Sequence, residues 1–91
     1  MPKKYRYYVI GGQYQPFCYG GTPTLLGAKR LASRNVEYWD NWQGWHIPAI
    51  YRAEDVRRAD NFYGVTTVPV DNASPHSYAR YNNNRIIWEE V

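Results

Sequence analysis

Hydrophobic and polar residues alternate along several short segments of this chain, as in strands that bury one face. The first two segments lie at 4–10 and 15–19, and the glycine pairs Gly11-Gly12 and Gly20-Gly21 follow them as turn residues, so we expect a hairpin. Further strands are predicted at 47–53, 65–68, 77–81 and 85–89. Because asparagine tolerates positive φ, residues 82–84 are expected to form a three-residue turn between the last two strands.

The clearest helical signal lies at 24–34. The apolar residues that recur there at helical spacing are Leu25, Ala28, Ala32 and Val36, with basic residues between them. Thr22 offers a hydroxyl N-cap, with Pro23 at the first helical position. Trp39 and Trp42 continue the period, whereas the basic residues of the last turn favour an end near Asn35. The pattern does not decide whether the helix ends near Asn35 or continues to Trp42.

The charged segment from Asp55 to Asp60 is expected to form a helical turn, and most of 61–75 is rich in turn formers. The elements together predict an α+β fold, with a small antiparallel sheet of about four to five strands covered on one face by a single helix. Residues 1–91 are expected to form one domain.

Composition adjusts this picture of the core. Leu, Ile, Val and Phe are scarce, but ten Tyr and four Trp supply apolar area, and the net charge is only +3. We therefore expect a folded domain whose core is built from aromatic residues and alanine, with at least two of the four tryptophans inside it. No charged-then-apolar leader, long apolar run or lipidation signal is visible, so we expect a cytoplasmic protein with no membrane contact.

Residues that could carry catalysis are few. Cys18 is the only cysteine, and in an apolar strand it is expected to be an inert, half-buried thiol even with His46 or His76 available as a base. Glu54-Asp55 would place its carboxylates on opposite faces of a strand. The two histidines lack the spacing of metal ligands, and no motif surrounds Ser77. We expect no catalytic residue, no metal and no cofactor.

Aromatic residues gather at 38–46, which holds three of the four tryptophans. Exposed aromatic clusters mark partner sites, because Trp and Tyr are enriched at binding hot spots. The residues predicted to bind a partner are Tyr38, Trp42, Trp45 and His46 from this segment and Lys29, Arg30 and Arg34 from the outer side of the helix. The alternative is that the tryptophans pack between helix and sheet.

Basic residues are also interleaved with aromatic residues, in the combination that single-stranded nucleic-acid binders use for stacking and phosphate contact. Three basic groups are concerned, together with Tyr5, Tyr7, Tyr8 and the Trp-rich segment: Lys3, Lys4 and Arg6; Lys29, Arg30 and Arg34; and Arg52, Arg57 and Arg58. A single-stranded DNA- or RNA-binding module is therefore the alternative function. A homodimer through exposed aromatic residues is a further alternative.

The segments 24–35, 37–46 and 50–55 resemble short accessory proteins encoded by phages and other mobile elements of gut Firmicutes. The recurring part is the helix core, in which a leucine is followed by Ala-Lys and the end consists of a small residue, Ser or Thr, and Arg. The Trp-rich stretch that follows is the more distinctive part. The resemblance implies no activity and no site residues, but small proteins of this kind are often inhibitors of host defence. It favours a non-enzymatic binding protein that inhibits a host protein or nucleoprotein, such as a CRISPR effector.

Overall fold

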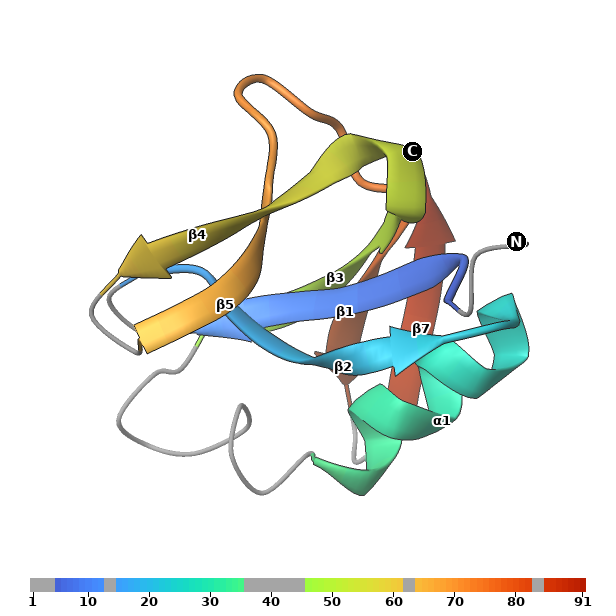
Figure 1. Cartoon of the computed structure of the whole chain (residues 1–91). Helices are drawn as coiled ribbons and strands as arrows, with labels where there is room; N and C mark the ends of the chain where they lie inside the picture. The colour runs from blue at the N-terminus through green and yellow to red at the C-terminus, as the bar shows by residue number, and fades with distance from the viewer. Residues whose placement is uncertain (1–4, 13–14, 36–45, 62–63, 83–84) are drawn as a thin grey trace.

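The computed structural model describes residues 5–12, 15–35, 46–61, 64–82 and 85–91, with backbone alone at 46, 47, 81, 82 and 85. Its elements are β1 (Tyr7–Gly12), β2 (Phe17–Thr22), α1 (Leu25–Arg34), β3 (His46–Arg52), the 3₁₀ turn η1 (Ala53–Asp55), β4 (Val56–Asn61), β5 (Gly64–Pro69), β6 (Ser77–Asn82) and β7 (Arg85–Glu90). Five strands form an antiparallel sheet in the order β2-β1-β3-β6-β7, and β4 and β5 form a separate hairpin (Figure 1). The predicted α+β class, with one helix packed on the sheet, is confirmed.

Helix α1 begins at its cap. The Thr24 hydroxyl accepts a hydrogen bond from the Gly27 amide at 3.0 Å, so Thr24 is the N-cap and the predicted cap at Thr22 is wrong. Thr22 instead ends β2, and its buried hydroxyl donates to the Thr24 carbonyl at 2.8 Å. The predicted end near Asn35 is confirmed, because Asn35 is the C-cap and its side chain donates to the Leu31 carbonyl.

The core lies between α1 and the centre of the sheet. Val9 of β1, Ile50 of β3 and the helix residues Ala28 and Ala32 are all fully buried. The half-buried side chains packed around them are Tyr7, Tyr19, Leu25, Leu31 and Trp88. The expectation of alanine in the core is confirmed, whereas that of a core built from aromatic residues is corrected. Among the described residues, Val9 and Ile50 occupy the centre with the two alanines, and aromatic rings and leucines surround it. Alanine at the contact lets the helix approach the sheet closely.

The β4–β5 hairpin is the main departure from the prediction. Residues 56–60 form a strand instead of the expected helical turn, because the segment pairs with β5 along its whole length, from Val56 opposite Pro69 to Asn61 opposite Gly64. The hairpin lies against β1 and β2 (Figure 1). Its ladder hydrogen bonds, together with this packing, outweigh the local preference that the charges suggested. The strand predicted at 65–68 is confirmed within β5.

The glycine pairs and the asparagine turn also differ from expectation. Gly12 belongs to β1 at φ +109°, and Gly20-Gly21 lies within β2, so neither pair is a simple turn. The last hairpin pairs Asn82 with Arg85, which leaves two connecting residues where three were expected. Within the described segments, the helix is not long and apolar enough to cross a bilayer.

Candidate functional site

Four of the seven residues predicted to bind a partner belong to or adjoin the Trp-rich segment. Tyr38, Trp42 and Trp45 lie outside the described residues, so their exposure stays a prediction. His46 is the first residue of β3, where the backbone alone is described. Nothing in the structure therefore tests the predicted anchors.

The other three predicted residues do lie together on one element. Lys29, Arg30 and Arg34 are on α1, away from the buried Ala28 and Ala32; Arg30 and Arg34 are exposed and Lys29 is half-buried. Among the described residues none of these three cations forms an ion pair. They present positive charge to solvent, but no described cleft accompanies them.

A cleft does lie between the sheet and the β4–β5 hairpin. It has a volume of about 300 Å³ and is open to solvent. Its lining residues are Tyr5, Tyr8, Ala53, Val56, Arg57, Arg58 and Thr67. A second hollow of about 310 Å³ shares Tyr5, Tyr8, Arg58 and Thr67 with it and reaches Cys18 and Gly21. We call the two together the tyrosine–arginine cleft, since tyrosines form one wall and an arginine belongs to both hollows.

The tyrosine wall depends on a glycine. The rings of Tyr5 and Tyr8 meet edge to face, with centroids 6.1 Å apart at 81°. Both lie over Gly21, the residue opposite Tyr8 in the β1–β2 ladder. A Cβ at position 21 would come within 2.8 Å of the Tyr5 ring, so only glycine allows the rings to lie this close to β2.

The arginine wall comes from the β4–β5 hairpin. Arg58 is opposite the buried Thr67, and strand pairing places both on the face that lines the cleft. Arg57 and Arg58 are exposed, and among the described residues neither has a carboxylate partner. The Asn61 side chain donates to the Pro16 carbonyl at 2.9 Å, which ties the far end of β4 to the start of β2.

The cleft and the helix occupy opposite faces of the sheet. Tyr7 packs against the helix-side core, whereas its neighbour Tyr8 lines the cleft, as alternation along β1 requires. The two basic groups predicted from the sequence are therefore separated: the α1 cations lie on one side and Arg57 and Arg58 on the other. One short ligand cannot contact both.

Cys18 borders the second hollow. Burial raises the pKa of its thiol above the ordinary value of 9.0, and the opposing effects of a backbone hydrogen bond at Gly20 and of the Arg58 charge are smaller. The thiol lies 3.6 Å from the Gly20 carbonyl oxygen. The predicted half-burial of Cys18 is confirmed. A thiol that stays protonated near neutral pH is a poor nucleophile, which agrees with the prediction that this cysteine is inert.

A serine, a histidine and a carboxylate meet at the start of β6, which sequence reasoning missed. His76 Nδ1 lies 3.2 Å from Ser77 Oγ, and its Nε2 lies 3.7 Å from Glu90 Oε1. Ser77 is opposite Glu90 in the β6–β7 ladder, so only the strand register brings the carboxylate there. The Ser77 side chain is 0% exposed, however, so no substrate can reach the hydroxyl in this conformation. The contact supports packing: the His76 ring also meets Tyr7 edge to face.

Metal ligation has no support in the described part of the chain. No group of three or more His, Cys, Asp or Glu side chains lies close enough there to hold an ion. Glu54 and Asp55 are in η1, not on a strand as assumed from the sequence. In this one-turn element the two carboxylates belong to no metal site among the described residues.

The sequence indicated the residue types that line the cleft but not their arrangement in space. Tyr5, Tyr8, Arg57 and Arg58 belong to the tyrosine and arginine groups singled out there, but nothing local showed that the hairpin carrying the arginines would pack over the tyrosines. Comparison of the chain with protein-family models, with curated proteins and with solved structures gave no match. The resemblance to mobile-element proteins therefore stays a prediction, and the cleft itself carries the functional argument.

Proposed function

We propose that this protein is a non-enzymatic binding protein that holds single-stranded DNA or RNA in the tyrosine–arginine cleft. The observation that carries the proposal is the arrangement of this cleft: two tyrosine rings form one wall, and Arg57 and Arg58, without carboxylate partners in the described structure, stand on the other. Bases stack on aromatic rings, and guanidinium groups contact the phosphates.

Charge and size agree with such a ligand. The chain carries a net charge of +3 and has a pI of about 9.1, which favours association with a polyanion. The cleft volume of about 300 Å³ is at the lower end of small-ligand sites, and its open side leaves room for a chain to continue beyond it. Each stacked base contributes roughly 1–3 kcal/mol in such proteins, so even one or two stacked bases give measurable affinity.

The function that the resemblance favours, inhibition of a host protein or nucleoprotein such as a CRISPR effector, rests on the Trp-rich segment and on the resemblance itself. The one described feature that supports it is the pair of exposed arginines on α1, Arg30 and Arg34, with the half-buried Lys29, which suit an acidic or phosphate-bearing partner. The two functions are compatible for a nucleoprotein that exposes single-stranded nucleic acid. A cytoplasmic location and a homodimer stay predictions.

Fluorescence anisotropy of labelled single-stranded oligonucleotides, titrated with the protein at low and near-physiological salt, tests the proposal. The variant Arg57→Ala/Arg58→Ala removes the arginine wall, and Arg30→Ala/Arg34→Ala is the matched control, since it removes the same charge from the opposite face. We expect wild-type binding that weakens with salt, a large loss in the cleft variant and a small loss in the control.

Other results would exclude the cleft. Equal losses in both double variants would mean that net charge, not the cleft, drives binding. A loss confined to the α1 variant would transfer the site to the helix. No binding by the wild-type protein at low salt would exclude nucleic acid as the ligand and favour inhibition of a host protein.

A further inference from the structure

Tyrosines continue from the cleft across the same face of the sheet. Tyr8 of β1 is directly opposite Tyr51 of β3. Ala49, two residues before Tyr51, is opposite Tyr78 of β6. Side chains that face each other in a ladder, or lie two apart on one strand, share a face, so Tyr8, Tyr51 and Tyr78 step across three adjacent strands on the side away from α1.

Tyr78 is the outermost of the three and the most accessible. Its exposure is 39%, whereas Tyr8 and Tyr51 are half-buried. Two strand spacings separate β1 from β6, which is about 10 Å. Ile87, 47% exposed, is opposite Arg80 on the same face and extends the apolar surface toward the sheet edge.

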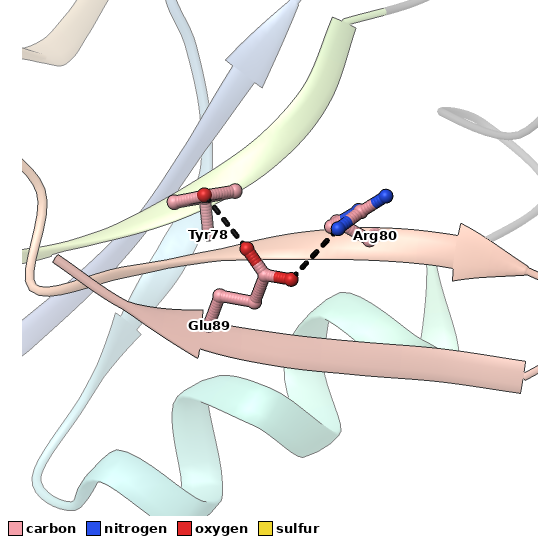
Figure 2. Close-up of polar contacts among 3 residues, drawn as sticks. All are labelled: Tyr78, Arg80 and Glu89. Atoms are coloured by element: carbon pink, nitrogen blue, oxygen red, sulfur yellow. Dashed lines mark hydrogen bonds and ion pairs between the residues drawn. The ribbon is translucent and has the colours of Figure 1, made fainter.

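A carboxylate fixes the orientation of Tyr78 (Figure 2). The Tyr78 hydroxyl donates to Glu89 Oε2 at 2.7 Å, and the Arg80 guanidinium donates to Glu89 Oε1 at 2.8 Å. The three side chains come from paired positions of β6 and β7. An exposed aromatic ring that is held in one orientation loses less rotamer entropy when a ligand covers it.

We propose that Tyr78 is a second base-stacking position, so that a single strand bound in the cleft continues over Tyr51 and onto the Tyr78 ring. The inference rests on the proposed function, because it extends the same ligand beyond the cleft. Glu89 already neutralises Arg80, so this position contributes stacking and no phosphate contact. Arg58, without such a partner, supplies the phosphate contact.

The division of roles sets the salt dependence. For single strands the slope of log affinity against log salt is about −0.7 for each phosphate contacted. Arg58→Ala should therefore make the slope shallower by about 0.7, whereas Tyr78→Ala should lower affinity at every salt concentration and leave the slope unchanged.

Oligonucleotide length is the experimental variable that separates the two positions. Binding of a labelled octanucleotide is measured by anisotropy, and an unlabelled dinucleotide is measured as its competitor. Tyr78→Ala should weaken binding of the octanucleotide by roughly 5- to 150-fold. Binding of the dinucleotide should be unchanged, because a dinucleotide whose bases stack on Tyr5 and Tyr8 does not extend to Tyr78. Tyr78→Phe keeps the ring and should retain most of the affinity. Leu26→Ala, which removes an exposed apolar side chain from α1, is the control.

Two outcomes would overturn the inference, and they differ from each other. If the wild-type protein binds the octanucleotide and Tyr78→Ala binds it equally well, the second position does not exist and the cleft stands alone. If the wild-type protein binds no oligonucleotide, the proposed function fails and its extension fails with it. Thermal unfolding of each variant verifies that folding is intact.

Discussion

Tyr8 lies directly opposite Gly21 in the β1–β2 ladder, and its ring occupies the space that any side chain at position 21 would need. A Cβ there would approach Tyr8 Cε1 to 2.9 Å and the Tyr5 ring to 2.8 Å. The tyrosine wall of the cleft therefore depends on the absence of a side chain on the neighbouring strand. A position in β2 that carries no functional group determines the shape of the proposed site.

Gly21→Ala is expected to displace both rings, and it should reduce the free energy of unfolding by about 1–3 kcal/mol, as other overpacking substitutions do. Oligonucleotide affinity should fall with it. Urea denaturation gives the first quantity and anisotropy the second. In a Tyr5→Ala background the destabilisation should shrink, because two of the three closest atoms belong to Tyr5. Equal destabilisation in the two backgrounds would contradict this account of Gly21.

The helix was the most predictable part of this fold, because its signals act between near neighbours in the chain. Alanines at helical spacing and hydroxyl residues before them placed α1 almost to the residue. The cap itself was misplaced by two residues, since Thr22 and Thr24 are both good caps and only the end of β2 decides between them. The choice between the two threonines depends on tertiary structure, which the local sequence pattern does not encode.

The cleft was less predictable, because it depends on contacts distant in sequence. Charged residues from Asp55 to Asp60 suggested a helical turn, yet pairing with β5 makes 56–60 a strand and places Arg58 in the same cleft as Tyr8. The sequence predicted Gly21 as a turn residue, but it lies within β2, directly beneath the Tyr5 and Tyr8 rings. Each error concerns a residue whose role is set by another strand.

Thr24→Ala should destabilise the protein by about 1 kcal/mol, because it removes the hydroxyl that accepts from the Gly27 amide at the start of α1. Thr24→Ser keeps an acceptor and should cost little. Urea denaturation of both variants measures the difference. Equal stability of Thr24→Ala and wild type would show that Thr22, the residue first expected to cap, compensates for the loss.

Cys18 should make stability depend on pH in the alkaline range. Its pKa is raised by burial above the ordinary 9.0, so the folded state favours the protonated thiol. The stabilisation is complete below pH 9.0 and is lost as pH rises, because the unfolded chain releases the proton first. From pH 8 to pH 10, the free energy of unfolding of the wild type should therefore fall relative to that of Cys18→Ala. A difference that stays constant over this range would contradict the burial of the thiol.

Glu89 should titrate below its ordinary pKa of 4.5, chiefly because of the hydrogen bond from Tyr78 and next because of the one from Arg80. Tyr78→Phe and Arg80→Ala should each raise the Glu89 pKa toward 4.5, and side-chain carboxyl NMR titration of Glu89 measures both changes. The interaction stabilises the folded state above pH 4.5 and is lost as pH falls, but its contribution to stability is small because the cluster is exposed. A Glu89 pKa that does not respond to Tyr78→Phe would mean that the carboxylate does not hold the ring, and the pre-oriented stacking surface would lose its physical basis.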